Sequence, residues 1–471
     1  MSLRLLRRNL LSRASNVGFS SLRLTGKTRS FKQSPYTTMS EPPILYGMVE
    51  GVESLYNYHK GGYHPVHIDD RLNHRYRVVH KLGYGGFSTV WLAVDEKTAQ
   101  YVAIKVSAAC DDSRELDILS HITRSSMSGC GTGQDEPPLF PIVLDRFQVS
   151  GPNGTHTCLV TLPARCSLKE VKNDLSGTCL LQLDVARSLA AQLVTAVSLV
   201  HAAGYAHGDL HLGNILLQMP SSLNEFSIEQ LYERYGEPER EPIVRVDKGA
   251  AAAAETPDPG VPSYAVLPLW PGLSSSEITL EDARMMLIDF GVAFRPSEKS
   301  RFESNSPPVL RPPEAYLEPT TPLSYSADIW SLGCLVFELL AHRTLLDGYF
   351  LVPEDEIMAQ RVELQGPMPP DWWAKWKDRP KWYDEAGSYL HPASDFWPWD
   401  RRFEQWVQKP RQTHKMGTMA QDELNALLEL LKWMLAWKPS ERPDIKGVLE
   451  SKYIKGWALP AYQRGLKTTS I

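Results

Sequence analysis

The chain has 471 residues, of which 42% are hydrophobic, 10% aromatic and 22% charged, and its formal net charge is −5. These are the values of a globular protein, and the length suits a two-lobed enzyme or two domains. No run of about 18 apolar residues occurs, so no transmembrane helix is expected. The six cysteines are scattered without the spacing of a zinc site or a disulfide framework, which indicates an intracellular protein.

The first 40 residues differ in charge from the rest of the chain. They hold eight Lys or Arg and no acid, which leaves 42 basic and 55 acidic residues, a net charge of −13, in the remainder. An acidic body disfavours direct nucleic-acid binding and attracts a basic polypeptide. The Arg- and Ser-rich residues 1–34 have the composition of a mitochondrial transit peptide. The alternatives are a disordered basic tail or an upstream extension with Met39 as the start, and in each case 1–40 should lie outside the fold.

Short strands are predicted from about Tyr76 onward. The segments RYRVVHKL, STVWLAVD and QYVAIKVS carry alternating or β-branched apolar residues, with GYGG and DEKT as turns between them. A helix is expected around 113–122, followed by a Gly/Ser-rich loop at 125–136 and further strands to Leu162. Residues 55–162 are therefore predicted to form a β-rich N-terminal lobe.

The rest of the chain is predicted to be mainly helical. Residues 185–204 (VARSLAAQLVTAVSLVHAAG) have an apolar stripe at helical spacing and end at Gly204. Residues 218–284 include the low-complexity stretch GAAAAAETPDPGVP, which indicates a spacer insertion that is helical near 227–235 and loose around 248–262. The predicted fold class is α+β, with a helical C-terminal lobe over 163–460 that contains the spacer.

A glycine-rich turn follows the first predicted strand. In LGYGGFSTVW, residues 82–91, the glycines allow backbone amides to approach a phosphate that a Cβ would block. A glycine string of this kind is equally well explained by an ordinary hairpin, and Ser88 stands where the motif has its third glycine.

The strand one hairpin downstream carries VAIK, residues 102–105. In protein kinases this lysine holds the α- and β-phosphates of ATP and pairs with a glutamate of the next helix. Lys105 and Glu115 fit these positions, although Asp111 and Asp112 lie near enough in sequence to compete. A lone Lys–Glu pair is usually a surface ion pair, but its place after a glycine loop favours ATP binding.

The stretch HGDLHLGN, residues 207–214, has the H-x-D-x-x-x-x-N pattern of a kinase catalytic loop. Asp209 is expected to act on the acceptor hydroxyl, and Asn214 is expected to bind magnesium. Gly208 and His211 stand where arginine and lysine are usual.

Further kinase motifs follow in the correct order. A DFG triplet comes after the buried-strand pattern MMLI, so Asp289 is expected to bind magnesium. A P-P-E variant of A-P-E, a D-x-W-x-x-G helix start and a late arginine complete the set. The residues expected to have structural roles are His207, Phe290, Gly291, Glu314, Asp328 and Arg442. Together, these motifs predict the bilobal eukaryotic protein-kinase fold.

With these residues the chain resembles the SR-protein kinases, serine/threonine kinases that phosphorylate Arg/Ser-rich splicing factors. The resemblance covers about 55–460 and is most specific in YHKGGYHPVHID (58–69), in GFSTVWLA and in the long spacer. It is closest to a divergent fungal branch with HGDLHLGNILL. That family also has serine at the third glycine position.

The resemblance implies a monomer that uses ATP and Mg²⁺ to phosphorylate Ser or Thr of protein substrates, Arg/Ser-rich ones by analogy. It implies no nucleic-acid or membrane partner, and a place in the cytoplasm and nucleus, whereas residues 1–34 favour the mitochondrion. Asp209, Lys105, Asn214 and His211 would be catalytic. The residues that would surround ATP are Leu82, Gly83, Gly85, Gly86, Val90, Ala103, Lys105, Glu115, Leu162, Ala164 and Leu216.

Two departures in the catalytic loop modify this expectation. Without an arginine at Gly208, a phosphate on the activation segment loses its bidentate partner, so activity without such phosphorylation is predicted despite the serines at 297, 300, 304 and 306. His211 supplies full charge only when it is protonated, which predicts a slower kinase unless the imidazole only packs in the loop.

The hinge departs as well. Pro163 has no N–H for adenine, which leaves the Leu162 carbonyl and the Ala164 amide. The tryptophan-rich segment 371–406 has mixed charges, which favours packing of an inserted helix pair over a substrate groove.

Two other functions stay open from the sequence. One is a pseudokinase that binds ATP or a partner without turnover, although Lys105, Asp209 and Asp289 are all present. The other is a small-molecule kinase of the aminoglycoside or choline type, in which H-G-D-x-H-x-x-N is an ordinary loop but the P-P-E and D-I-W-S-L-G elements are lacking.

Overall fold

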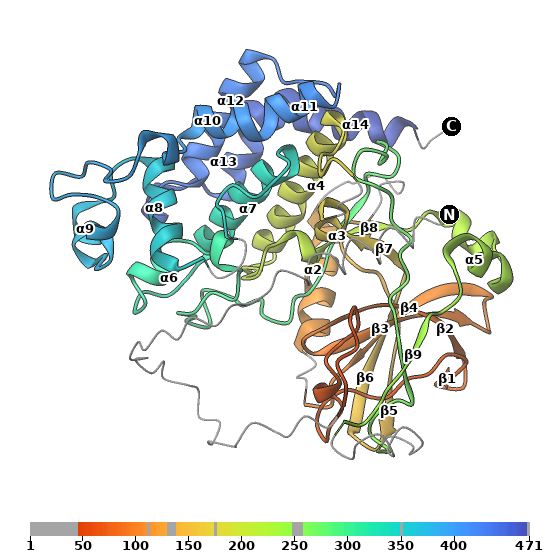
Figure 1. Cartoon of the computed structure of the whole chain (residues 1–471). Helices are drawn as coiled ribbons and strands as arrows, with labels where there is room; N and C mark the ends of the chain where they lie inside the picture. Colours follow the sequence, from red (N-terminus) through yellow and green to blue (C-terminus); the bar gives the residue numbers. More distant parts are fainter. Residues whose placement is uncertain are drawn as a thin grey trace. The chain divides into compact units, whose positions relative to one another are not determined.

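The computed structural model in Figure 1 describes residues 46–110, 114–129, 138–173, 177–246, 258–348 and 352–468. All of them belong to one compact unit, Tyr46–Ile471. The predicted basic segment 1–40 and the competing carboxylates at 111 and 112 lie outside the described residues.

An antiparallel sheet forms the N-terminal lobe, and in the described part of the chain it has six strands in the order β1-β2-β3-β4-β6-β5. The strands are β1 (Arg71–Leu72), β2 (Tyr76–Gly85), β3 (Ser88–Asp95), β4 (Gln100–Ser107), β5 (Val143–Gly151) and β6 (Gly154–Thr161). The predicted strands are confirmed, because alternate β-branched and aromatic side chains fill one buried cluster that includes Val78, Trp91 and Ile104.

The helix predicted at 113–122 is longer in the structure, where α2 runs over Arg114–Gly129. The predicted loop at 125–136 is therefore wrong over its first five residues, and 130–136 lie outside the described residues. Ser and Gly are poor helix formers, but tertiary packing overrides propensity. Leu119 and Ile122 anchor the helix in the main core at 3% and 0% exposure.

Helices build the C-terminal lobe (Figure 1). In chain order they are α3 (Leu168–Lys172), α4 (Leu183–Ala202), α6 (Glu314–Leu317), α7 (Tyr325–Leu340), α8 (Glu354–Gln365), α9 (Pro370–Lys375), α10 (Trp399–Phe403), α11 (Lys409–Thr413), α12 (Gln421–Met434), α13 (Ile445–Glu450) and α14 (Leu459–Thr468). Short 3-10 turns lie at η1 (Leu55–Asn57), η2 (Leu212–Asn214), η5 (Pro308–Leu310), η6 (Arg379–Lys381), η7 (Ala393–Asp395) and η9 (Pro439–Glu441), and π-helical turns lie at η8 (Glu404–Gln408) and η10 (Ile454–Ala458).

A small sheet carries the segments on either side of the spacer. Its order is β11-β8-β7, with β7 (Ala164–Ser167), β8 (Ile215–Gln218) and β11 (Met285–Leu287). The strand β8 follows HGDLHLGN, and β11 precedes the DFG triplet. Their antiparallel pairing, with Ile215 opposite Leu287, brings these two motifs to the same end of the ladder.

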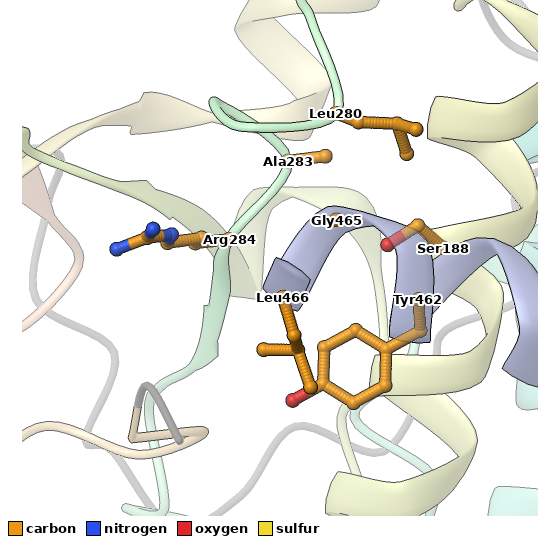
Figure 2. A pocket seen from close by; sticks show the side chains of 7 residues that line it. All are labelled: Ser188, Leu280, Ala283, Arg284, Tyr462, Gly465 and Leu466. Carbon is orange, nitrogen blue, oxygen red and sulfur yellow. The ribbon is translucent and has the colours of Figure 1, made fainter. Parts of the chain in front are cut away.

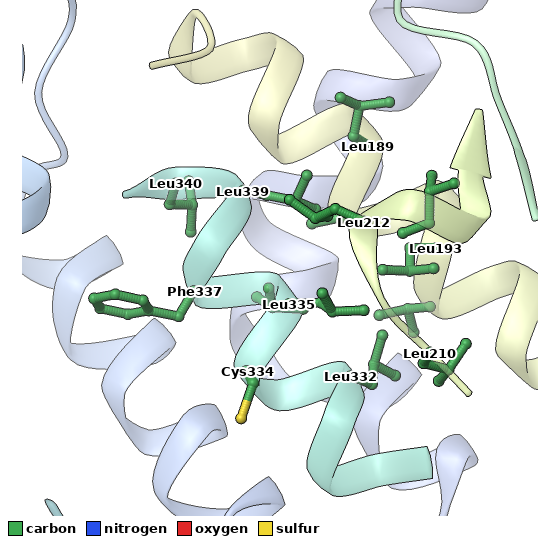
Figure 3. Packing of buried hydrophobic residues seen from close by; sticks show 14 of the residues in the cluster. Leu189, Leu193, Leu210, Leu212, Leu332, Cys334, Leu335, Phe337, Leu339 and Leu340 are labelled. Atoms are coloured by element: carbon green, nitrogen blue, oxygen red, sulfur yellow. The ribbon is translucent and has the colours of Figure 1, made fainter. Parts of the chain in front are cut away.

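The core of the C-terminal lobe gathers side chains from α4, α7 and the segment between α4 and β8 (Figure 3). The residues labelled there, all at most 3% exposed, are Leu189, Leu193, Leu210, Leu212, Leu332, Cys334, Leu335, Phe337, Leu339 and Leu340. Leu210 and Leu212 alternate with Asp209 and His211, which are only half-buried. The buried leucines thus hold the polar residues of this stretch at the surface of the core.

By length and composition, α4 is apolar enough to cross a membrane. It is not an uninterrupted apolar run, because Asp184 and Arg187 lie within it, and so it does not meet the criterion applied to the sequence above. Within the structure, 72% of its most apolar window is buried. Its apolarity is therefore accounted for by packing at the centre of the C-terminal lobe.

The spacer 218–284, predicted as part of the C-terminal lobe, divides between the two lobes: Leu223, Leu231 and Leu269 pack on the N-terminal sheet, whereas Ile278 and Ala283 near its end lie in the core of the C-terminal lobe. It contains η3 (Ser221–Glu225), α5 (Ile228–Tyr235), β9 (Arg240–Pro242) and β10 (Tyr264–Val266), so the helix predicted near 227–235 is confirmed. The Tyr232 hydroxyl donates to the carbonyl of Val79 at 2.8 Å. The Leu269 amide donates to the carbonyl of Lys81, also at 2.8 Å.

The spacer stretch predicted to be loose, 248–262, falls in two parts. Residues 248–257 lie outside the described residues. Residues 258–262 are described, and the Gly260 carbonyl accepts a hydrogen bond from Asn153 at 2.7 Å. That carbonyl is therefore fixed against the N-terminal lobe.

The aromatic side chains of the tryptophan-rich segment 371–406 pack inside the fold, as predicted: those of its first part form a cluster with α8, and Trp399, Phe403 and Trp406 lie in the main core. Trp372, Trp376 and Tyr383 are at most 3% exposed and pack against Met358 and Val362 of α8. The Trp372 indole also donates to Glu318 at 2.6 Å. Most of its aromatic surface is therefore used inside the fold.

Candidate active site

The glycine-rich turn is the tip of the β2–β3 hairpin, where Gly83 lies opposite Val90 and Gly85 opposite Ser88. A Cβ built on Gly83, Gly85 or Gly86 would meet no atom within 4 Å. These glycines are therefore not required by packing within the described chain. Their missing side chains leave an open backbone edge, which fits a cradle for phosphate groups.

Lys105 lies on β4 opposite Val90, so it faces the hairpin from the next strand. Its ammonium group is 2.5 Å from Glu115 Oε2, near the start of α2. The side chains are 27% and 18% exposed, so the pair is partly shielded from water. Strand, helix and ion pair are joined in the arrangement that an ATP-binding lysine requires.

The residues expected around adenine fall on two groups of adjacent segments. On the N-terminal sheet, Leu82 lies next to Gly83 in β2, and Ala103 lies opposite both Leu92 and Thr161. On the small sheet, Ala164 lies opposite Gln218, and Leu216 lies between Ser167 and Met286. Leu162 connects β6 to β7, is 40% exposed, and its carbonyl accepts from Thr161 Oγ1 at 3.2 Å.

A buried carboxylate holds the backbone of HGDLHLGN. Asp328, 2% exposed, accepts from the amides of His207 at 2.7 Å and Gly208 at 2.9 Å. His201 Nε2 lies 3.0 Å from the same carboxylate. Burial raises the pKa of Asp328, but the contact with His201 and the charges and amides around it lower that pKa below its usual value overall. Asp328 therefore stays ionised and fixes the start of the loop.

His201 is absent from the sequence-based set of structural residues. It lies near the end of α4, six residues before His207, and its ring also packs against Tyr325. A histidine in the last turn of a largely apolar helix is the signal that marks it in the sequence.

Gly208 adopts φ +78°, a left-handed conformation in which a side chain is strained. A Cβ there would lie 3.4 Å from the Phe294 ring. Glycine thus removes the usual guanidinium and at the same time relieves the backbone.

His207 and Phe290 join the loop to the DFG triplet. Their rings are 5.1 Å apart, and Phe290 also packs edge-on against Phe140 at 5.9 Å. His207 Nδ1 accepts from the Asp209 amide at 3.3 Å, so Nε2 carries the proton that is donated to the Ile288 carbonyl at 3.1 Å. Burial lowers the pKa of His207, in agreement with a neutral ring.

The two expected magnesium ligands are brought together by the backbone. The Ile288 amide donates to the Asn214 carbonyl at 3.0 Å, and Asp289 follows at φ +65°. The Gly291 amide lies 3.4 Å from Asp289 Oδ1. Asn214 Nδ2 donates to the Asp209 carbonyl at 3.0 Å, which turns its amide nitrogen inward and leaves its oxygen for another partner. The side-chain oxygens of Asn214 and Asp289, together with phosphate oxygens of ATP, would supply the oxygen ligands that Mg²⁺ prefers.

Asp209 has one carboxylate oxygen, Oδ1, that is buried and lacks a hydrogen-bond partner among the described residues. A buried carboxylate oxygen without a donor is costly unless a donor arrives from outside the chain. A substrate hydroxyl is such a donor.

His211 directs its ring toward Asp209. Its Nδ1 accepts from the Gly213 amide at 3.0 Å, which assigns the proton of a neutral ring to Nε2. Nε2 lies 3.6 Å from Asp209 Oδ2. With Nδ1 held by Gly213, the ring turns its Nε2 edge toward Asp209, on the side where the usual lysine would place its ammonium group.

Glu314 and Arg442 form a buried pair below the P-P-E segment. The guanidinium donates to both carboxylate oxygens, at 2.7 and 2.6 Å, and stacks 5.0 Å from the Trp330 ring. This contact ties the end of the activation segment to the segment after α12.

A small hollow elsewhere in the lobe carries none of these residues (Figure 2). Its lining comes from α4, the end of the spacer and α14, namely Ser188, Leu280, Ala283, Arg284, Tyr462, Gly465 and Leu466. It holds no paired acid and base and belongs to the packing of the spacer end.

Comparison with known proteins agrees with this geometry. The family model described as "Protein kinase domain" matches residues 76–225 and 275–454, so its gap falls in the spacer. The chain is 27% identical over 420 residues to "Serine/threonine-protein kinase SRPK" of Physarum polycephalum, which covers 86% of this chain and 91% of that protein. It is 26% identical over 491 residues to "Protein kinase dsk1" of Schizosaccharomyces pombe, with 88% of each chain covered.

A human protein named "SRSF protein kinase 3" is 34% identical over 187 residues, which are 37% of this chain and 32% of the relative. The relatives with SR-protein-kinase names confirm the resemblance predicted from the motifs. The chain belongs to the protein kinase family, as a serine/threonine kinase of the SR-protein kinase type.

Proposed function

We propose that the chain transfers the γ-phosphate of ATP to serines of basic, Arg/Ser-rich proteins, and that it needs no phosphate on its activation segment. The observation that carries the catalytic part is the pair of Lys105 and Glu115 at 2.5 Å, together with a catalytic loop braced by Asp328.

Each residue then has a role that the geometry supports. The orphan oxygen of Asp209 accepts a hydrogen bond from the substrate hydroxyl and orients it. Lys105 binds phosphate oxygens, and the oxygens of Asn214 and Asp289 hold Mg²⁺, which neutralises the charge of the phosphates. His211, with Nε2 3.6 Å from Asp209 Oδ2, stands in place of the lysine that stabilises the transferred phosphoryl group. Phosphoryl transfer depends mainly on such positioning and charge neutralisation.

The substrate class is supported by charge and by relatives. Outside residues 1–40 the chain has a net charge of −13, which attracts basic polypeptides. The human relative is named for SRSF proteins.

Independence from activation-segment phosphorylation is supported by the catalytic loop. Gly208 offers no guanidinium to a phosphate, yet its amide is already held by Asp328 at 2.9 Å.

The test is a transfer assay with Mg-ATP, using an Arg/Ser-repeat peptide beside an ordinary basic protein, with Asp209→Asn as the inactive control. The protein should be treated with phosphatase first. We expect faster transfer to the repeat peptide, no transfer by Asp209→Asn, and no requirement for an upstream kinase. Equal rates on both substrates would contradict the substrate class, and activity only after treatment by an upstream kinase would contradict the independence. Nucleotide binding without any transfer would instead identify a pseudokinase.

A further inference from the structure

The segment before residue 76, where the kinase-domain match begins, is called the leader here. It contains the motif KGGYH, residues 60–64, to which the proposed chemistry gives no role. Its two glycines are required by the backbone. Gly61 has φ +87°, and a Cβ on Gly62 would lie 2.0 Å from the Asn57 carbonyl oxygen. The amides of Gly62 and Tyr63 close the turn by donating to the carbonyls of His59 at 2.8 Å and Asn57 at 2.7 Å. The turn serves to place Tyr63.

Tyr63 reaches the glycine-rich turn. It is 2% exposed, and its hydroxyl donates to the backbone carbonyl of Gly85. The backbone of Tyr63 is fixed in turn, because Asn153 Nδ2 donates to its carbonyl at 2.7 Å. The Tyr63 ring packs edge-on against Tyr58 at 5.6 Å. The hydroxyl is thus presented from a rigid support.

This hydrogen bond determines the orientation of a peptide plane that the nucleotide needs. In a trans peptide the carbonyl of one residue and the amide of the next point in opposite directions. Holding the Gly85 carbonyl toward Tyr63 therefore turns the Gly86 amide away from the leader. Since neither glycine has a side chain to pack, the freedom of the tip would otherwise be large.

A second contact holds the middle of the same strand. Lys81, which precedes Leu82, is fully buried and forms an ion pair with Glu53 of the leader. The Tyr58 hydroxyl donates to the other oxygen of Glu53 at 2.5 Å. The Lys81 ammonium also lies 5.3 Å from the centre of the Trp91 ring. The leader thus contacts β2 at its middle, through Lys81, and at its tip, through Gly85.

We propose that the leader residues 53–63 support the nucleotide site without contacting ATP themselves. Tyr63 is a positioning residue that holds the glycine-rich turn where its amides meet the phosphates of ATP. The inference rests on the proposed ATP-dependent function. Fixing the turn before the nucleotide arrives reduces the ordering cost of binding. The leader therefore raises the affinity for nucleotide and has a smaller effect on kcat, the rate at which bound substrate reacts.

The test compares two variants that each remove one hydroxyl bonded to the backbone. Tyr63→Phe keeps the ring and loses the bond to Gly85. Tyr264→Phe is the matched control, because its hydroxyl accepts from the Ile68 amide at 3.2 Å and does not touch the glycine-rich turn. The measurements are the Kd of a non-hydrolysable ATP analogue with Mg²⁺, KM for ATP, kcat and the unfolding temperature.

We expect Tyr63→Phe to raise the Kd and KM about three- to tenfold, the effect of one lost hydrogen bond, with kcat changed less than about twofold. Tyr264→Phe should leave the Kd and KM as in the wild type. Equal nucleotide affinity in Tyr63→Phe and wild type, or an equal loss in both variants, overturns the inference and leaves the proposed function standing. A wild-type chain that binds no nucleotide overturns both.

Discussion

The ring of His211 lies so close to Gly213 that a Cβ on Gly213 would be 2.8 Å from both Nδ1 and Cε1. The Gly213 amide donates to Nδ1 at 3.0 Å. Histidine in place of the usual lysine therefore fits this loop only because glycine follows two residues later. His211 and Gly213 therefore form a single structural unit.

This relationship predicts a coupled effect on turnover. Gly213→Ala should push the ring away from Asp209 and lower kcat roughly tenfold, since small displacements of a positioning group are costly. In a His211→Ala background the same change should have little effect, because the clash is gone. The measurement is kcat of the four proteins of the cycle at saturating ATP and peptide. Equal losses in both backgrounds would show that Gly213 acts independently of His211.

The pair of Lys105 and Glu115 predicts a loss of catalytic efficiency with little loss of stability. Glu115→Ala removes a charged hydrogen bond worth about 1.5–3 kcal/mol, which should lower kcat/KM for ATP roughly ten- to a hundredfold. Asp117→Asn, an exposed carboxylate on the same helix, is the control and should leave kcat/KM unchanged. An unchanged kcat/KM in Glu115→Ala would mean that the lysine is positioned by other groups.

The buried pair of Glu314 and Arg442 predicts a loss of stability. Glu314→Gln leaves a guanidinium that is 0% exposed without its carboxylate, so the free energy of unfolding should fall by about 3 kcal/mol or more. Urea denaturation measures this change. The exposed neighbour Glu441→Gln should shift the free energy by less than about 0.5 kcal/mol. A loss that small in Glu314→Gln would contradict the importance of the pair.

Asp95 predicts a pH dependence of stability. Arg75 donates to both of its oxygens at 2.7 Å, and this contact, with hydrogen bonds from Thr98 and Lys97, lowers the pKa of Asp95 to about 2. A lowered pKa means that the unfolded chain binds the proton more readily. The stabilisation is therefore complete above the ordinary pKa near 3.8 and is lost as the pH falls toward 2.

Asp95→Asn should accordingly lower the free energy of unfolding by about 1 kcal/mol at pH 7, a value reduced by the partial exposure of Arg75. The difference from wild type should shrink between pH 4 and pH 2, as followed by urea denaturation at each pH. Glu96→Gln, which breaks an exposed pair with Arg71, should show almost no difference at any pH. A difference for Asp95→Asn that is independent of pH would show that the carboxylate charge is not its cause.

Much of the fold and of the candidate site could be predicted from the sequence because the chemistry requires particular residue types at short, ordered spacings. Lys105, Asp209, Asn214 and Asp289 are recognisable in this way, and the alternation of apolar residues located the strands around them. The roles of these residues stay proposals for the assays above. The end of α2 was not predictable, because core contacts of Leu119 and Ile122 stabilise a helix that continues into poor helix formers.

Local patterns in the chain are sufficient to name the family, since kinase motifs depend on neighbours within a few residues. Contacts between distant segments decided the rest. The Tyr63 hydroxyl meets Gly85 22 residues away, His201 meets Asp328 127 residues away, and the spacer returns to Val79 across 153 residues. No local spacing encodes these contacts, because each depends on how separate segments pack once water is excluded between them. They determine how the glycine-rich turn and the catalytic loop are held.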